Sequence, residues 1–237
     1  MFPWVAEAKS DLQQAFFRRT GRPFEREFRA LGQLLSPGAF CLDVGANRGQ
    51  SIDALQMLPF DVRVMSFEPN PDLYRRLVDR YGDGDDVSLV PCGLGAGTQR
   101  TTIHVPVYNG YPFDGLGTLH DDETDLWLQH SVFFFDEERL ETKTYTCDIV
   151  ALDDLELDPV DFIKLDIQGS ELDALVGAAS TIERDRPTLL IERPDESIRD
   201  YLAPFGYRMY DYDPKQDRVV QVESLTGSVN MFLLPEP

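Results

Sequence analysis

The sequence of 237 residues predicts an α/β domain with a mostly parallel sheet, preceded by a small helical appendage. From residue 39 onward, apolar runs of strand length alternate with amphipathic segments of helix length, as in parallel sheets with right-handed crossovers. The first run, 39–44, leads into a glycine-bearing turn at 45–49, which is typical of a ligand-binding strand–turn–helix unit. Hydrophobic residues make up 42% of the chain, enough for a sizeable core.

The appendage, residues 1–37, is predicted to form two helices, over 5–18 and 24–35, and residues 38–237 the main domain. The second helix has an apolar face at helical spacing, made of Phe24, Phe28, Leu31 and Leu35. We interpret the appendage as a lid or a dimer-forming element. The alternative is that it only covers the sheet.

The main domain is expected to hold a seven-stranded sheet with helices on both faces and a closing antiparallel hairpin. Asn70 and Pro71 predict the N-cap and first residue of one helix, and Ser170 with Asp173 predicts a capping box at another. The expected strands are 39–44, 62–67, 87–91, 101–107, 143–149, 161–167, 188–192, 206–212 and 229–234, and the expected helices are 49–58, 71–81, one starting at 169–170, and 195–203.

Residues 108–140 form an irregular insertion, rich in aromatic and acidic residues. Long connections inside a compact domain are commonly functional. We interpret the insertion as a substrate-covering lid, and the alternative is a satellite apolar cluster without a role in binding.

The turn after the first strand reads Asp43-x-Gly45-x-Asn47-x-Gly49, and Glu68 ends the next strand 25 residues after Asp43. An acid there can accept hydrogen bonds from ribose hydroxyls, so the pattern is typical of a nucleoside-binding domain. A dinucleotide turn would read G-x-G-x-x-G and offer its amides to a pyrophosphate. Asp43 would repel a phosphate but would pair with the ammonium group of S-adenosylmethionine, and asparagine tolerates positive φ at position 47. The alternative is a simple tight turn, with Glu68 capping the next helix.

Charge and cysteine content narrow the function class. The chain has 42 acidic and 22 basic residues, and this net charge of −20 opposes binding to nucleic acid or to an anionic membrane surface. Cys41, Cys92 and Cys147 show no zinc-like spacing, so we expect buried free thiols in a reducing cytoplasm. Neither a signal peptide nor a membrane-spanning run is recognisable, which also predicts a cytoplasmic location.

Several segments, in this order, resemble the FkbM family of methyltransferases. They are Asp43-Val44-Gly45-Ala46-Asn47-Arg48-Gly49, Phe67-Glu68-Pro69-Asn70-Pro71, Leu152-Asp153-Asp154-Leu155, Ile163-Lys164-Leu165-Asp166-Ile167-Gln168-Gly169-Ser170-Glu171-Leu172 and Ile191-Glu192, with a looser likeness at Val90-Pro91-Cys92-Gly93-Leu94-Gly95. The resemblance covers roughly residues 38–193.

This resemblance implies a Rossmann-like class I methyltransferase fold that binds S-adenosylmethionine. It also implies methyl transfer to a hydroxyl oxygen of a sugar, glycan or secondary metabolite. The turn would hold the methionine part of the cofactor and Glu68 the ribose, while Gln168 stands where many members have an acid. The cofactor contacts expected from this likeness are Asp43, Gly45, Ala46, Asn47, Gly49, Glu68, Pro69, Cys92, Gly93 and Asp166.

Two acids at the ends of neighbouring strands, Asp166 and Glu192, are the main catalytic candidates. They would either share a divalent cation such as Mg²⁺, or one of them would be the general base that a hydroxyl acceptor needs. The alternative is that Asp166 caps the following helix and Glu192 pairs with Arg193 or Arg186. His120, in the irregular insertion, is a further candidate base.

Two other function classes stay open at this point. One is an NAD-dependent oxidoreductase on a similar sheet, and the other is a catalytically inactive adenosyl-binding partner module. We expect a small-molecule or glycan substrate and a homodimer, and neither nucleic acid nor membrane as a partner.

Overall fold

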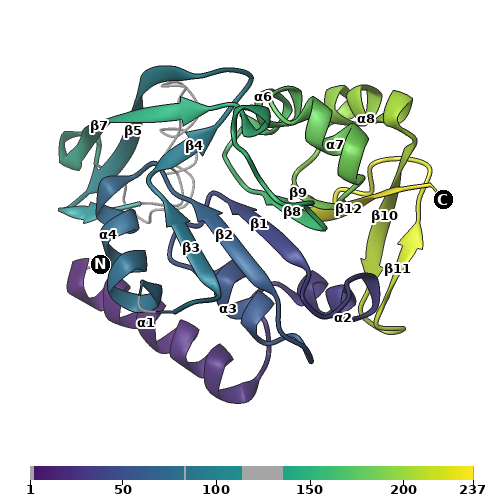
Figure 1. Ribbon diagram of the computed structural model, residues 1–237. Coiled ribbons are helices and arrows are strands. Elements are labelled where there is room, and N and C mark those ends of the chain that lie inside the picture. Colours follow the sequence, from purple (N-terminus) through teal and green to yellow (C-terminus); the bar gives the residue numbers. More distant parts are fainter. Residues whose placement is uncertain (1–2, 83, 114–135, 237) are drawn as a thin grey trace.

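The computed structural model describes residues 3–82, 84–113 and 136–236 (Figure 1). They form the predicted α/β fold, with a main sheet of eight strands and a smaller sheet of four in this part of the chain. In spatial order the main sheet is β11 (Arg218–Gln221), β10 (Tyr207–Asp213), β12 (Asn230–Pro235), β9 (Thr188–Glu192), β8 (Phe162–Leu165), β1 (Phe40–Val44), β2 (Arg63–Phe67) and β3 (Val87–Val90).

The five strands from β9 to β3 run parallel, as the alternation of strands and helices predicts. The C-terminal end has the predicted closing antiparallel hairpin, because β10 and β12 pair antiparallel, with β12 inserted between β10 and β9. It differs from the prediction in one further strand, β11, which pairs with β10. The sheet therefore has eight strands rather than seven. The additional strand, β11, lies in a turn-rich link and is mostly exposed, so it lacks the apolar pattern of a core strand.

The smaller sheet has the order β4 (Cys92–Leu94), β7 (Leu140–Val150), β5 (Gln99–Tyr108) and β6 (Tyr111–Pro112). The predicted insertion is regular at both of its ends, because β5, β6, the short helix η3 (Glu137–Arg139) and β7 reach into 108–140. Its middle, including His120, lies outside the described residues.

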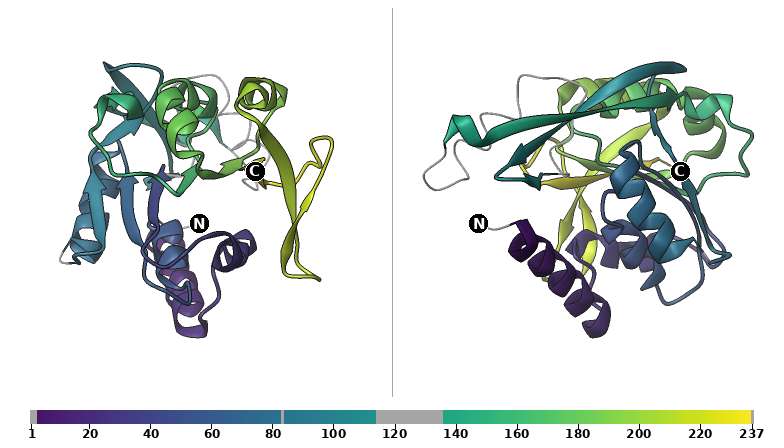
Figure 2. Two further views of the ribbon diagram at one scale, coloured as in Figure 1. Left: turned by 45° about the vertical axis from the view of Figure 1, so that its right-hand side comes forward. Right: turned by 90° about the vertical axis from the view of Figure 1, so that its left-hand side faces the viewer.

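Helices cover both faces of the main sheet (Figures 1 and 2). On one face, apolar side chains of α3 (Gln50–Gln56) and α4 (Pro71–Tyr81) pack on Cys41 and Val64. On the other, α6 (Glu171–Val176), α7 (Ala179–Asp185) and α8 (Glu196–Leu202) pack on Leu42 and Val44. Successive residues of β1 thus point to opposite cores, as strand geometry requires. Two short helices, η4 (Leu152–Asp154) and η5 (Ala203–Phe205), complete the layers.

The N-terminal segment forms α1 (Pro3–Thr20), η1 (Arg26–Ala30) and α2 (Leu31–Leu34). The predicted helix 24–35 is therefore a 3₁₀ turn followed by a single α turn, and Phe24 lies outside both. Polar contacts with a buried carboxylate, that of Asp53 in α3, hold α1 against the domain. It accepts a hydrogen bond from Gln14 at 3.2 Å, and Arg80 and Arg18 reach it at 2.7 and 3.6 Å.

Local signals differ in how well they predicted the details. The side chain of Asn70 accepts hydrogen bonds from the amides of Asp72 and Leu73, and Pro71 is the first residue of α4, as expected. Ser170 makes no side-chain capping bond, so the predicted capping box is wrong. The three cysteines are buried free thiols. No helix of the described part is long and apolar enough to cross a membrane.

Candidate active site

The turn between β1 and α3 uses its own amides for internal hydrogen bonds. The amides of Gly45 and Ala46 both donate to the carbonyl of Phe67, at 3.0 and 3.1 Å. The amide of Asn47 donates to the carboxylate of Glu68 at 2.8 Å. A phosphate-binding turn would point such amides at its ligand. This turn therefore lacks three of the donors that a dinucleotide site would need.

The glycines of the turn are required by neighbouring chain segments. Gly45 has φ +86°, and a Cβ placed there would lie 2.0 Å from the carbonyl oxygen of Asp166. Gly49 has φ +82°, and its Cβ would lie 2.6 Å from the Tyr81 ring. Both glycines thus allow close packing of the chain rather than a close approach by a ligand. Asn47 adopts φ +49°, as the sequence predicts.

Glu68 is 5% exposed and joins the ends of two adjacent strands. One carboxylate oxygen accepts the amide of Asn47, and the other accepts the amide of Asn70 at 2.8 Å. The capping alternative for Glu68 is therefore partly confirmed, whereas its role in ribose binding stays a prediction. Glu68 lies at the carboxyl end of β2, where α/β sheets bind ligands, and it also bonds to the N-cap residue of the next helix.

The remaining cofactor candidates lie next to this acid. Cys92 and Gly93 belong to β4, and a Cβ on Gly93 would lie 2.7 Å from Ile149 and 3.6 Å from Pro69. Burial raises the pKa of Cys92 to about 11, so its thiol is not a nucleophile at neutral pH. The absence of a side chain at Gly93 leaves room for the side chain of Ile149.

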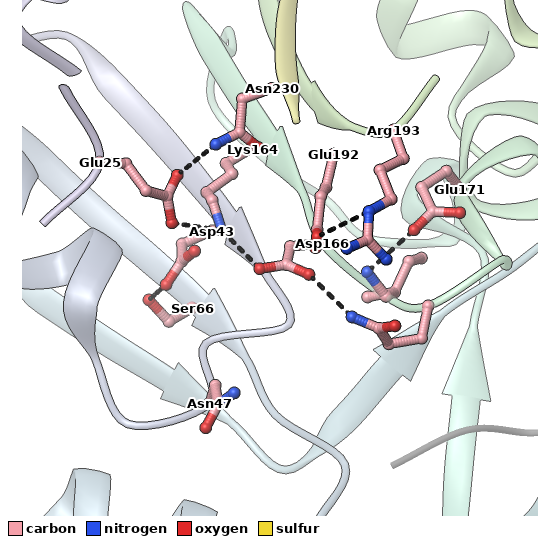
Figure 3. A network of polar contacts seen from close by, with 12 residues as sticks. Glu25, Asp43, Asn47, Ser66, Lys164, Asp166, Glu171, Glu192, Arg193 and Asn230 are labelled. Atoms are coloured by element: carbon pink, nitrogen blue, oxygen red, sulfur yellow. Dashed lines mark hydrogen bonds and ion pairs between the residues drawn. The ribbon is translucent and has the colours of Figure 1, made fainter. Parts of the chain in front are cut away.

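A buried lysine that the sequence did not single out occupies the centre of a polar network (Figure 3). The side chain of Lys164 is 3% exposed, and its Nζ lies 3.0 Å from Asp166 Oδ2 and 3.7 Å from Glu25 Oε1. The amide of Asn230 donates to the other oxygen of Glu25 at 3.2 Å. Burial works against the charge of Lys164, but the carboxylates of Asp166, Glu25 and Asp43 raise its pKa, so it stays an ammonium.

Asp43 is the completely buried member of this network. Burial raises its pKa, although Lys164 and a 3.1 Å hydrogen bond from Ser66 favour the carboxylate. The sequence predicted that Asp43 pairs with a ligand ammonium. In the structure the ammonium that acts on Asp43 is that of Lys164, because Asp43 has no exposed surface.

Asp166 and Glu192 come together, as predicted, and their carboxyl groups share a hydrogen bond. Burial opposes ionisation of Asp166, but the Lys164 ammonium holds its pKa below the ordinary value. The hydrogen bond to Asp166, together with burial, raises the pKa of Glu192 to about 8. Two close carboxyl groups with separated pKa values are the arrangement expected of an acid–base pair.

The sequence also offered alternative roles for these two acids, a helix cap for Asp166 and an ion pair for Glu192, and the structure supports only the second. Asp166 does not cap the helix after β8, because the N-cap residue of α6 is Ser170 and no side-chain hydrogen bond caps this helix. Glu192 does lie 3.8 Å from Arg193. Among residues 3–82, 84–113 and 136–236, no three His, Cys, Asp or Glu side chains are grouped to hold a metal ion. The Mg²⁺ hypothesis gains no support there.

A cleft of about 280 Å³ lies at the carboxyl ends of β1, β8 and β9, where open α/β sheets bind their ligands. It is lined by Phe24, Glu25, Gly45, Ala46, Asn47, Gln50, Ser51, Lys164, Asp166, Gln168, Glu192, Val229 and Asn230. Asn47 is one of these lining residues, and its side-chain oxygen is buried without a hydrogen-bond partner among the described residues. A donor from a ligand or from an ordered water would satisfy this acceptor.

Sequence reasoning missed the members of this lining that come from the two ends of the chain, and it missed the role of Lys164. One signal was present. Lys164 interrupts the apolar run Phe162-Ile163-Leu165, and a lysine inside a core strand needs charged partners. The identity of those partners was not readable, because Glu25 and Asn230 lie in distant segments.

Three comparisons with known proteins bear on this site. The profile of the family described as "Methyltransferase FkbM domain" matches residues 43–209. The curated AMB antimetabolite synthetase AmbE of Pseudomonas aeruginosa is 28% identical over 169 residues, which cover 62% of this chain and 8% of AmbE. A solved methyltransferase FkbM from Methylobacillus flagellatus superposes with a TM-score of 0.54 at 21% identity, covering 88% of this chain and 48% of that one.

A TehB-like SAM-dependent methyltransferase from Corynebacterium glutamicum aligns with a TM-score of 0.48 at 10% identity, covering 98% of this chain and 99% of that one. By comparison, the chain spans about half the length of the solved FkbM methyltransferase and less than a tenth of the length of AmbE.

Proposed function

This chain belongs to the FkbM methyltransferase family, and from that premise we propose that it methylates a hydroxyl oxygen of a small molecule, using S-adenosylmethionine. The acceptor class that we favour is a sugar, a glycan or a secondary metabolite. Family membership removes the oxidoreductase alternative. The proposal is carried by one observation, the excess of carboxylates over ammonium groups around the cleft.

The charges of the cleft suit a cationic methyl donor. Glu25, Asp43 and Asp166 surround a single buried ammonium, Lys164, so the site keeps a surplus of negative charge. S-adenosylmethionine carries a sulfonium and an ammonium group and lacks phosphates. The inward-turned amides of the β1–α3 turn fit the same conclusion, since they would contribute little to binding a pyrophosphate.

Two groups of the chain are suited to hold the donor. The orphaned side-chain oxygen of Asn47 can accept a hydrogen bond from its ammonium. Glu68 is suited to its ribose, since a carboxylate can accept about four hydrogen bonds and the two backbone amides fix its orientation. When bound, S-adenosylmethionine supplies an electrophilic methyl group.

Replacing Glu68 with alanine is expected to weaken cofactor binding by roughly a hundredfold, because the two charge-assisted hydrogen bonds between its carboxylate and the ribose would be lost. The amides of Asn47 and Asn70 lose their acceptors as well, so the cofactor turn loosens. Calorimetric titration with S-adenosylhomocysteine measures the affinity. Asp153→Ala is the matched control, because Asp153 also accepts two backbone amides, those of Ser180 and Thr181, away from the cleft. Equal affinity in both variants would remove Glu68 from ribose binding.

Glu192 is the group that we assign as general base. It lines the cleft and has its pKa raised to about 8, close to the value that suits proton transfer near neutral pH. Asp166, kept ionised by Lys164, holds the carboxyl group of Glu192 in place through their shared hydrogen bond. Glu192 would take the proton of the acceptor hydroxyl as the oxygen is methylated.

This assignment predicts a rising pH profile. Below its pKa Glu192 is protonated and cannot accept a proton, so turnover should increase with pH up to about 8 and then level off. Glu192→Gln should lower turnover by roughly a hundredfold and abolish the rise. Glu171→Gln, the matched control, should keep it, since Glu171 does not line the cleft. A profile that falls with pH would contradict the role of Glu192.

The function as a whole is tested in two steps. Calorimetry with S-adenosylhomocysteine and NAD first establishes the cofactor, and binding of NAD alone would refute the proposal. Transfer of a radioactive methyl group to a panel of hydroxylated metabolites then separates an active enzyme from an inactive adenosyl-binding module. Donor binding without transfer to any hydroxyl compound would favour the inactive module.

A further inference from the structure

We infer that Phe24, Glu25, Val229 and Asn230 form an acceptor wall of the cleft that selects a neutral or cationic molecule with an apolar group beside its reactive hydroxyl. The inference rests on the proposed function, because it concerns the second substrate of the same site. All four residues line the cleft.

The acceptor wall is one structure made from two remote segments. Phe24 and Glu25 precede η1, whereas Val229 and Asn230 lie at the start of β12. The 3.2 Å hydrogen bond from Asn230 to Glu25 joins the two segments across 205 residues. Figure 3 shows this bond beside the contact of Glu25 with Lys164. The wall is therefore anchored directly to the catalytic network.

The position of the wall relative to the family domain points to the acceptor. The family profile matches residues 43–209, and all four wall residues lie outside that range. The shared domain contains the cofactor turn, Glu68 and the acid pair, which serve the reaction that the family has in common. A wall added from outside it is free to be specific for this chain's own substrate.

The wall has an apolar rim. Phe24 is 46% exposed and Val229 is 53% exposed, although each contributes to the cleft lining. An apolar group that covers them gains the free energy of removing that surface from water. An aromatic or alkyl group next to the reactive hydroxyl meets this requirement.

The groups below the rim discriminate by charge. Glu25 and Asp166 face the cleft, and the lysine that lines it, Lys164, is already held by these two carboxylates. A phosphate or carboxylate on the acceptor would meet like charges without a basic partner on the wall. Like-charge contacts in a partly buried site give strong discrimination between ligands of similar shape.

The test uses paired probes, one neutral and one carrying a phosphate group: benzyl alcohol with benzyl phosphate, and phenyl β-glucoside with its 6-phosphate. Binding to the full chain is measured by saturation-transfer NMR with S-adenosylhomocysteine present. Each neutral probe should bind at least roughly tenfold more tightly than its phosphate. Phe24→Ser and Val229→Ser should each weaken neutral-probe binding by roughly fivefold. Phe16→Ser and Val220→Ser are controls, since these exposed side chains do not line the cleft.

Three results would each overturn the inference. One is that the phosphate probes bind as tightly as the neutral probes, another is that the neutral probes do not bind at all, and the third is that Phe24→Ser and Val229→Ser both bind the neutral probes as the wild type does. Calorimetry with S-adenosylhomocysteine on the wild type and on each variant distinguishes a failure of the acceptor wall from a failure of the proposed function. If the wild type binds that compound but the probes fail, the acceptor wall is refuted and the proposed function stands. If that compound does not bind, the proposed function itself fails.

Discussion

Replacing Gly45 with alanine is expected to destabilise the fold by about 3–5 kcal/mol, combining a left-handed backbone strain with severe overpacking. Gly45 has φ +86°, and the new Cβ would lie 2.0 Å from the carbonyl oxygen of Asp166. That oxygen is backbone, so it cannot swing aside as a flexible side chain would. The end of β1 would have to separate from the end of β8, where the amide of Asp166 bonds to Val44 at 3.0 Å.

Urea-induced unfolding measures this loss, and calorimetry with S-adenosylhomocysteine measures its effect on the site. Gly169→Ala is the matched control. Gly169 has nearly the same backbone angle, φ +88°, but a Cβ there would meet no atom within 4 Å. It should lose only the strain, about 1–2 kcal/mol. Similar losses in the two variants would show that the contact with Asp166 is unimportant.

Replacing Lys164 with methionine is expected to destabilise the protein by about 3–5 kcal/mol, the usual effect of removing one partner from a buried ion pair. Methionine fills much of the same volume, so packing is largely kept. The loss comes from Glu25, Asp43 and Asp166, which would share a buried site without their ammonium. Thermal and urea unfolding measure the change, and turnover should fall with it because Asp166 would no longer be held ionised.

The pH dependence of this loss has a definite sign. Without the ammonium, the pKa values of Glu25 and Asp43 rise further and that of Asp166 is no longer held down, so folding takes up protons. The stability gap between the Lys164→Met variant and the wild type should therefore narrow as the pH falls from 8 to 5, about the range of raised carboxyl pKa values. Adding Glu25→Gln should recover part of the stability.

Lys143→Met is the control, because Lys143 forms its ion pair at the surface rather than in the core. Lys143 is 52% exposed and pairs with Asp72 at 2.5 Å on the surface. Its removal should cost at most about 1 kcal/mol, as is usual for exposed ion pairs. A loss at Lys143 as large as that at Lys164 would contradict the importance of burial.

The sequence predicted the fold best where local chemistry and packing agree. The limits of α4 were predicted to the residue, because Asn70 caps it, Pro71 starts it and one face is apolar. The bounds of β9 were also correct, since a short strand with a wholly apolar centre, Leu189-Leu190-Ile191, has few other places in an α/β fold. The exposed edge strand β11 and the split of helix 24–35 were missed, because tertiary pairing rather than local pattern decides both.

The candidate site was predicted in its carboxylates but not in its cation. Strand ends alone bring Asp166 to Glu192, and both assignments followed from the positions of those ends. The raised pKa of Glu192 arises from its hydrogen bond to Asp166 and from burial, and neither cause can be read from the sequence. The role of Glu25 depends on a loop between two helical segments, and no periodicity describes where such a loop will lie.

The bond between Asn230 and Glu25 also sets an order of assembly. The two residues are 205 positions apart, so a chain leaving the ribosome displays Glu25 long before its partner is made. Contacts between such remote positions form late, since their loop must close first. A nascent chain can thus contain the whole β1–α3 turn while two of the four residues of the proposed acceptor wall, Val229 and Asn230, are still absent. The selectivity that we propose for the wall would therefore arise only with the final strand, β12.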